Sequence, residues 1–349
     1  MSVRNIIFTA LLVLPLPGYA ENLLDVYKEA QVSDPVWLGA IAGNRAAQEA
    51  SEQSFAAFLP NAGFSASSGR NSQDINSSNS ATLVNRSDSY NSNSWSLNIS
   101  QPIFRMANYA SHRQAKASVR QADTVLSVEA QNLILRVAQA YFDVLSAKSD
   151  LAAVTAEKKA IARQLDQAQK RFEVCLIAIT DVHEAQASYD LVVADEIVAE
   201  NLVVIARQAL HEITGKTYAK LNDLGDSLEL KSPEPNDMED WVQRAIDNNL
   251  SLSAAMIAVE VAQETVKIRR AGHYPTLDLV ASSGNNTSHL STSGSDIDNS
   301  YIGVQFDLPI YSGGLVTSQT RQALAELDQT RQALTQTRRA TEKQTRDAY

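Results

Sequence analysis

Apolar residues recur mostly at spacings of three and four along the central part of the chain, in the series Val137, Tyr141, Val144, Leu151, Val154, Ile161, Leu165, Ala168 and Phe172. Such spacing lines one face of an α-helix. No proline interrupts the sequence between Met106 and Pro233, so the pattern predicts a helix over about 108–172. At 1.5 Å per residue this helix would be about 100 Å long, a length that a coiled coil or helical barrel supports.

A second helical stretch follows after a short interruption. The pattern is broken over 174–181 and resumes over 182–214, and Gly215 is suited to end it. Together the two stretches predict a long antiparallel helical hairpin over about 105–215, followed by a proline-containing linker over 216–239. A further helix is expected over about 23–58, divided near Asp34-Pro35 because the residue before a proline avoids the helical conformation.

Strict alternation of apolar and polar residues marks two other segments. One face takes Trp95, Leu97, Ile99, Ile302, Val304 and Phe306, and the other takes Ser96, Asn98, Gln305 and Asp307. Alternation of this kind predicts β-strands with one apolar and one wet face. Weaker alternation before each segment completes two hairpins, over about 62–104 and 276–311.

The segments that join the strands of each hairpin are rich in asparagine and serine. Residues 70–94 and 284–300 bury no apolar area, so we expect them to be long solvated loops. Aromatic residues would then mark the strand ends: Trp95, Phe104, Tyr301 and Tyr311. This arrangement is typical of an outer-membrane barrel, and a soluble β-sandwich hairpin is the alternative. Four strands cannot close a barrel, so the barrel interpretation requires an oligomer.

The chain also contains an internal repeat. Residues 25–69 align without a gap on residues 240–284, at an offset of 215 positions, and Pro60 falls on Pro275. The match resumes at an offset of 207, where Pro102 falls on Pro309, and continues at 208, where Tyr141 falls on Tyr349. Duplication predicts a first unit over 21–239 and a second over 240–349. The four prolines are expected at helix–strand junctions.

The second copy ends at Tyr349, in the middle of its helical pattern, whereas the first continues well past Tyr141. We therefore interpret the chain as C-terminally incomplete. At the other end, residues 1–20 have a short charged start, an apolar run and small residues before Glu21. This is the pattern of a secretory signal peptide cleaved before Glu21.

Composition narrows the functional classes. The formal charge of −10 over 349 residues argues against nucleic-acid binding, which needs a basic patch. A single cysteine, Cys175, excludes an internal disulfide framework and a four-cysteine zinc site. The five histidines are scattered, so we expect no metal, no cofactor and no catalytic activity. At the hairpin tip, Thr180 or Asp181 is expected to cap the next helix.

Three short sequence motifs of this chain resemble those of a known protein family. The tip segment over 171–182, the string Gly-His-Tyr-Pro-Thr-Leu-Asp-Leu over 272–279 and the string Leu-Pro-Ile-Tyr-Ser-Gly-Gly over 308–314 resemble the TolC family. The similarity extends over essentially the whole chain after the signal peptide. One departure lies at the tip, where the family has glycine and this chain has Cys175. A second is the absence of the family's second helical hairpin and of its acidic ring.

The resemblance implies a mainly α-helical fold with a small β part. Three chains would form a long α-barrel of coiled-coil helices and a shared twelve-stranded outer-membrane β-barrel. The apolar strand positions would face lipid and the polar ones the lumen, and Thr180 and Asp181 would help to close the periplasmic end. Opening would follow an iris-like movement of the coiled coils.

In function, the resemblance implies a passive exit duct in the outer membrane of a Gram-negative bacterium, with its helices in the periplasm. The duct would serve type I protein secretion, multidrug efflux or both. Its implied partners are a periplasmic adaptor and an inner-membrane ABC or RND-type transporter. Two alternatives come from other classes: a periplasmic adaptor, which also has a helical hairpin, and a structural coiled-coil surface protein.

Overall fold

The computed structural model describes residues 21–79, 82–218, 220–224, 232, 234–290 and 293–349. The expected signal peptide over residues 1–20 lies outside the described residues, as does part of the expected linker. Contacts divide the chain into two compact units, one formed by residues 1–41 and 128–231 and the other by residues 42–127 and 232–349. The division crosses two continuous helices, α2 (Pro35–Ala56) and α3 (Met106–Glu173). The two units are defined by contacts and do not test where one copy of the sequence repeat ends and the next begins. That boundary therefore stays a prediction.

The first unit is helical. It contains α1 (Leu23–Ser33), the second part of α3 and α4 (Ile179–Thr214). Its core consists of apolar side chains from all three helices and the segment after α4: Val26, Ala30, Leu133, Val137, Tyr141, Val144, Leu210 and Leu221. Val137, Tyr141 and Val144 of the predicted helical series are therefore in the core, whereas Phe172 near the tip is exposed. Burial of the core surface holds the helices together.

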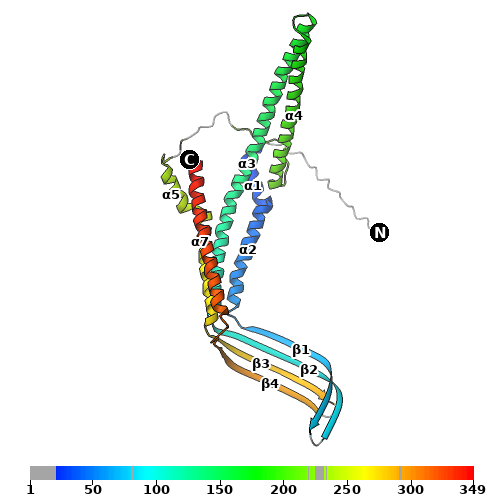
Figure 1. Ribbon diagram of the computed structural model, residues 1–349, viewed down its shortest axis with the longest axis vertical. Coiled ribbons are helices and arrows are strands. Elements are labelled where there is room, and N and C mark those ends of the chain that lie inside the picture. Colours follow the sequence, from blue (N-terminus) through cyan, green and yellow to red (C-terminus); the bar gives the residue numbers. More distant parts are fainter. Residues whose placement is uncertain (1–20, 80–81, 219, 225–231, 233, 291–292) are drawn as a thin grey trace, which may run out of the picture. The chain divides into compact units, whose positions relative to one another are not determined.

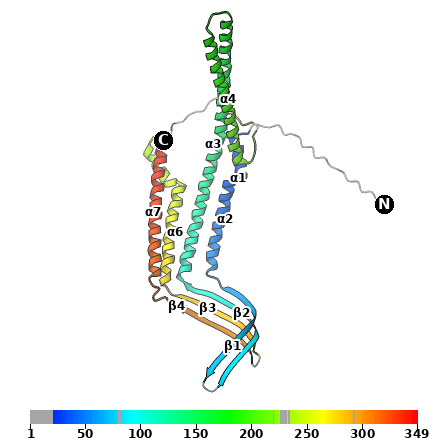
Figure 2. The same cartoon turned by 45° about the vertical axis from the view of Figure 1, so that its right-hand side comes forward.

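Helices α3 and α4 form the predicted hairpin, which Figures 1 and 2 show as two long antiparallel helices. Lys158 on α3 pairs with Glu196 on α4, which also accepts a hydrogen bond from Thr155. Helix α4 ends at Gly215, whose φ of 66° is left-handed and whose N–H donates to the His211 carbonyl at 2.7 Å. The predicted cap is thus confirmed.

The second unit contains one antiparallel sheet with the strand order β1-β2-β3-β4 (Figures 1 and 2). Its strands are β1 (Asn61–Asn79), β2 (Thr82–Arg105), β3 (Thr276–Leu290) and β4 (Ser293–Asp307). Consecutive strands are neighbours, so the two predicted hairpins lie side by side, joined by β2 and β3. The outer edges of the sheet are β1 and β4.

The expectation of long solvated loops within each hairpin is wrong. Pairing continues from Asn61 opposite Ser100 to Asn79 opposite Thr82, and from Thr276 opposite Asp307 to Leu290 opposite Ser293. Polar side chains hydrogen-bond across the paired strands, as Ser67 does with Ser94 at 2.8 Å and Asn71 with Ser92 at 2.8 Å. Ladder and cross-strand hydrogen bonds therefore extend the strands where no apolar core does.

Helix breaks occur at equivalent places in the two copies. Asp34 separates α1 from α2, as predicted, and its position corresponds to Asn249 in the repeat. Asn249 separates α5 (Met238–Asn248) from α6 (Leu250–Arg270) without a following proline. Asp34 has φ −64° and ψ 116°, and Asn249 has φ −71° and ψ 118°. Both side chains accept backbone N–H bonds from the next helix, so each residue ends one helix and caps another.

The remaining helices belong to the second copy. The 3-10 turn η1 (Ala271–His273) leads from α6 towards β3, and α7 (Leu315–Ala348) follows β4. Helix α7 packs beside α6, where Val266, Ala323 and Leu327 are buried (Figure 2). Within the described ranges, no helix combines the length and apolar character needed to cross a lipid bilayer.

Candidate functional surfaces: the sheet and the hairpin tip

The sheet brings the six predicted apolar strand residues to one face. Ile99 lies opposite Ala281, which lies opposite Ile302, so the alternating positions of β2 and β4 share a side. Phe64 and Leu97 are also directly opposite each other. The exposed fractions are 75% for Ile302, 59% for Val304 and 63% for Phe306. Large apolar side chains at such exposure form a surface that favours a nonaqueous or protein neighbour.

The four predicted polar strand residues lie on the opposite face. Ser96 pairs with Gly284, and Asn98 pairs with Ser282, while Gln305 and Asp307 occupy the same parity on β4. Sequence analysis missed an ion pair on this face. Arg105 donates two hydrogen bonds to Asp278, from Nε to Oδ1 at 2.9 Å and from Nη2 to Oδ2 at 2.6 Å. This bidentate contact joins β2 to β3, and therefore one hairpin to the other.

Phe104 lies at the end of β2, as expected, but Trp95 and Tyr301 do not mark strand ends, because the strands are longer than predicted. Trp95 lies within β2, and Tyr301 lies within β4. Tyr301 pairs with Ser282, which puts it on the polar face. Its ring covers Gly303, where an added Cβ would lie 2.2 Å from the tyrosine hydroxyl oxygen. Tyr311 follows β4 and is 87% exposed.

The four junction prolines occupy different settings. Pro60 and Pro275 directly precede β1 and β3, at equivalent positions of the repeat. Pro102 lies inside β2, at a register shift that leaves Ile103 without a directly paired residue. A bulge is a position where a strand tolerates proline. Pro309 follows the end of β4.

The two copies differ in how the second strand joins the next helix. Helix α3 begins directly after β2 ends at Arg105. In the second copy, residues 308–314 intervene before α7, and Gly313 and Gly314 adopt φ values of 62° and 81°. The extra residue that changes the repeat offset from 207 to 208 lies in this connection.

At the hairpin tip, α3 ends in a Schellman motif. Leu176 N–H donates to the Arg171 carbonyl at 2.9 Å, and Cys175 N–H donates to the Phe172 carbonyl at 2.8 Å. This motif needs a left-handed residue, and Cys175 supplies it with φ 56°. Glycine is favoured here because a Cβ makes the conformation strained. Where this chain departs from the family's glycine, Cys175 therefore places a side chain at a left-handed position.

The predicted capping role of Thr180 or Asp181 is wrong. Ala178 occupies the N-cap of α4 and makes no side-chain capping bond. Thr180 and Asp181 follow in the first turn, where both are exposed and the Thr180 hydroxyl donates to the Asp181 carboxylate at 3.4 Å. Asp181 there still complements the positive end of the helix dipole.

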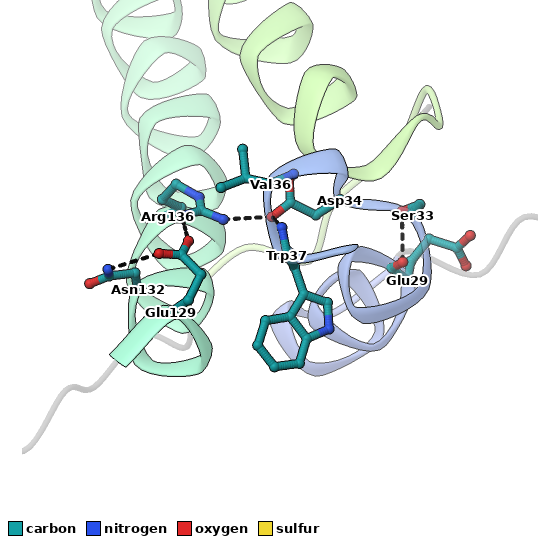
Figure 3. Close-up of polar contacts among 8 residues, drawn as sticks. All are labelled: Glu29, Ser33, Asp34, Val36, Trp37, Glu129, Asn132 and Arg136. Carbon is teal, nitrogen blue, oxygen red and sulfur yellow. Dashed lines mark hydrogen bonds and ion pairs between the residues drawn. The ribbon is translucent and has the colours of Figure 1, made fainter. Parts of the chain in front are cut away.

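A buried acidic residue at the first helix break is held by an arginine that sequence analysis did not identify (Figure 3). The Asp34 side chain is 3% exposed, and its Oδ2 accepts a hydrogen bond from Arg136 Nη2 at 2.5 Å. Arg136 also donates to Glu129 Oε1 at 2.5 Å, and Asn132 donates to Glu129 Oε2 at 3.2 Å. The hydrogen bond from Arg136 lowers the pKa of Glu129, and burial opposes this effect only partly.

Asp34 also organises the start of α2. Its Oδ1 accepts from the Val36 N–H at 3.3 Å, and its Oδ2 accepts from the Trp37 N–H at 3.2 Å. The carboxylate thus receives both backbone and arginine hydrogen bonds, which compensate its burial. The only signal in the sequence was the Asp34-Pro35 dipeptide, because nothing local to Arg136 indicates a partner so distant along the chain.

Other polar groups have structural partners. His112 Nδ1 hydrogen-bonds the Ser54 hydroxyl at 2.8 Å, between α3 and α2. In the described part of the chain, no group of three or more histidine, cysteine, aspartate or glutamate side chains is placed to hold a metal ion.

Comparisons with known proteins give this geometry a context. A family model described as outer membrane efflux protein matches residues 26–216 and 241–349. The outer membrane protein TolC of Vibrio cholerae is 40% identical over 309 residues, which cover 87% of this chain and 68% of the relative. The alkaline protease secretion protein AprF of Pseudomonas aeruginosa is 29% identical over 342 residues, covering 97% of this chain and 71% of AprF.

Solved structures show the same fold at lower sequence identity. The outer membrane channel CmeC of Campylobacter jejuni superposes with a TM-score of 0.73 at 18% identity, covering 97% of this chain and 75% of that one. The chain spans about two thirds of the length of the TolC relatives it matches.

Proposed function

Because this chain belongs to the outer membrane efflux protein family, we propose that it forms one third of a homotrimeric exit duct through the outer membrane and periplasm. Family membership places the protein in the Gram-negative outer membrane and in the class of export channels. It also decides against the adaptor and the surface coiled coil, since the family matches both copies of the repeat. The relatives are channel proteins.

The observation that carries the proposal is the two-faced, open sheet. Its apolar face, with Ile302, Val304 and Phe306 well exposed, suits contact with lipid, and its polar face suits a wet lumen. The described sheet has four strands and two unpaired edges. Three such sheets joined edge to edge give twelve strands, which is within the size range of closed outer-membrane barrels.

The helical part would form the periplasmic section of the duct. Helices α3 and α4 supply a hairpin with exposed apolar residues at its tip, including Val174 at 64% and Leu176 at 71% exposed. In this proposal the tips of three chains meet near Thr180 and Asp181 and close the periplasmic end. A periplasmic adaptor and an inner-membrane ABC or RND-type transporter open the duct and provide the energy.

The duct would carry out no chemistry and need no cofactor. Polar groups on the lumen face, such as Ser96 and Gln305, would keep the passage hydrated rather than bind one cargo. AprF is by its name a protease secretion protein. Its similarity, together with that of TolC, supports protein secretion and multidrug efflux as the two candidate uses.

Labelling of single cysteines tests the proposed faces. Cys175 is first replaced by glycine, and Val304→Cys is compared with its direct neighbour Gln305→Cys in the full chain in intact outer membranes. A water-soluble maleimide should label position 305 and leave position 304 unmodified, whereas a lipid-soluble maleimide should label position 304. The reverse pattern, or protein found in the inner-membrane fraction, would contradict the proposal.

A further inference from the structure

The two copies of the repeat contact each other through ion pairs between α3 and α6. Arg113 Nε lies 3.1 Å from Glu264 Oε2, and Arg120 Nη2 lies 2.6 Å from Glu260 Oε1. Burial raises the pKa of Glu264, but hydrogen bonds from Lys267 and Arg113 outweigh it and leave that pKa below its ordinary value. Glu264 is therefore held ionised at this contact between the copies.

The repeat assigns each of these residues a counterpart. Arg113 and Arg120 correspond to Arg321 and Asp328 on α7, at the offset of 208. Glu260 and Glu264 correspond to Arg45 and Glu49 on α2, at the offset of 215.

The structure supports both offsets independently. The Tyr141 hydroxyl donates to the Asn222 carbonyl at 2.7 Å and lies 3.4 Å from the Glu21 carbonyl. The corresponding Tyr349 hydroxyl donates at 2.7 Å to the side chain of Asn236, the counterpart of Glu21. In both copies the tyrosine hydroxyl therefore lies near the same position of the repeat, which agrees with an offset of 208 for the tyrosine and of 215 for its neighbour.

The four counterparts can form the same kind of contact as the α3–α6 ion pairs, which we call a seam. Arg321 and Glu49 reproduce the charges of Arg113 and Glu264. Asp328 and Arg45 reproduce the Arg120–Glu260 pair with both charges reversed, so the interaction stays attractive. Reversal of both charges keeps the complementarity that contact between these two residues needs.

These counterparts are available for contact in the single chain. Arg45, Glu49, Arg321 and Asp328 are all exposed. None of the ion pairs among the described residues involves Arg45, Glu49 or Arg321, and Asp328 pairs only with Arg331 on its own helix, at 3.0 Å. One hydrogen bond of the internal seam is not repeated, because Gln114 donates to Thr265 and the counterpart of Thr265 is Ala50.

The edge strand β1 also has space for a neighbour that its counterpart β3 already has. An added Cβ at Gly284 on β3 would lie 2.5 Å from the Trp95 carbonyl of β2, so only glycine fits at this strand contact. Its counterpart Gly69 lies on the open edge strand β1 and has nothing within 4 Å of an added Cβ. The missing neighbour corresponds to β4, because Ser96, opposite Gly284, has Gly303 as its counterpart.

We propose that α7 and β4 of one protomer dock on α2 and β1 of the next, with Arg321 paired to Glu49, Asp328 paired to Arg45 and Gly303 opposite Gly69. The partner is a second copy of this chain. The proposal rests on the proposed homotrimer and specifies its interface. In a ring of alternating copies, every seam between chains then repeats the seam inside the chain.

Crosslinking tests the pairing directly in the full chain with Cys175 replaced by glycine. Arg45→Cys with Asp328→Cys, and Glu49→Cys with Arg321→Cys, should each give dimers and trimers when a short bis-maleimide is added to outer membranes. Asp328→Cys alone, with no cysteine on α2, is the background control. The matched control pair Arg45→Cys with Glu342→Cys, which joins α2 to a distant site on α7, should give no crosslinked oligomers.

Charge reversal provides a second readout. Asp328→Arg should weaken association about threefold at each interface, because an exposed ion pair becomes a repulsion. Adding Arg45→Asp should restore association, since the pair is then reversed as a whole. The control Asp347→Arg also reverses an exposed acid with a partner on its own helix, Lys343, and should leave the trimer unchanged.

The outcomes separate this proposal from the function it rests on. A stable trimer without crosslinks at either pair, or without rescue by Arg45→Asp, overturns the pairing and leaves the duct intact. A wild-type protein that is monomeric in the outer membrane overturns both. Crosslinking at both pairs, with rescue, supports the interface.

Discussion

At the scale of single residues, Asp34 shows how a buried charge can be tolerated at a helix break. The carboxylate receives two backbone N–H bonds from α2 and one hydrogen bond from Arg136. Removal of the arginine would leave the backbone bonds but not the opposite charge. Because an unpaired buried charge is costly, Arg136 is expected to stabilise this unit beyond the contribution of an exposed ion pair.

We predict that Arg136→Met lowers the free energy of unfolding by about 2 kcal/mol at neutral pH, because Asp34 and Glu129 both lose their arginine partner. The pKa of Glu129 is lowered in the folded chain, so its stabilising contribution is present above the ordinary value of about 4.3 and is lost as the pH falls through the lowered value. The difference between variant and wild type should therefore shrink below about pH 4. Denaturant unfolding followed by circular dichroism measures it.

The control for this prediction is Lys170→Met, which removes an exposed ion pair between residues four apart on α3, with Asp166 at 2.7 Å. Its effect should stay below about 0.5 kcal/mol. An equal loss of stability in the two variants, or a difference that does not change with pH, would contradict the role assigned to Arg136.

Cys175 is the second residue whose conformation leads to a prediction. Cys175→Gly should stabilise the hairpin tip by about 1 kcal/mol, because it removes the Cβ from a left-handed position while keeping both Schellman hydrogen bonds. Cys175→Ala keeps a Cβ and should bring no gain. Hydrogen exchange of the amides around the tip, including that of Leu176, distinguishes the two variants. Equal exchange rates would show that the backbone there is unstrained.

At the scale of elements, the sequence predicted those features whose signals are local. The break at Asp34-Pro35, the end of α4 at Gly215 and the two faces of the strands all follow from adjacent residues or short periodicities. The outer parts of the strands were missed because their asparagine and serine residues are paired by a partner strand, which no local pattern reports. The break at Asn249 was missed for a similar reason, since it lacks the proline that marks Asp34.

The candidate surfaces divide in the same way. Alternation assigned the ten strand residues to two faces, and the register reproduces that division, although contact with lipid or lumen stays a prediction. The Arg105–Asp278 and Asp34–Arg136 contacts join residues far apart in the sequence. Only the folded chain brings these side chains together, so spacing could not reveal them.

The open strand edge gives a prediction for β1. Gly69→Ala should reduce trimer formation, because its counterpart Gly284 has no room for a Cβ beside the neighbouring strand. Gly63→Ala on the same strand should assemble normally, since its counterpart Asp278 carries a side chain in the paired sheet. Native electrophoresis of detergent extracts measures the trimer fraction. Normal assembly of both variants would exclude close contact at Gly69.

At the scale of the whole molecule, two chemically similar seams should respond differently to dilution. Arg113→Met weakens a contact inside one chain, so its effect on unfolding should not depend on protein concentration. Arg321→Met weakens the corresponding contact between chains, so its effect should increase as the protein is diluted. Thermal unfolding of the two variants at several concentrations tests this difference, and identical concentration dependence would contradict it.

The reversed charges of one seam also bear on how the duplicated gene can evolve. A ring made only of first copies would place Arg120 against Arg45, and a ring made only of second copies would place Asp328 against Glu260. Like charges would face each other at every joint of either ring. Under the proposed pairing, each half therefore complements the other better than it complements itself. A shorter gene encoding six identical subunits would associate more tightly after a change of these charges.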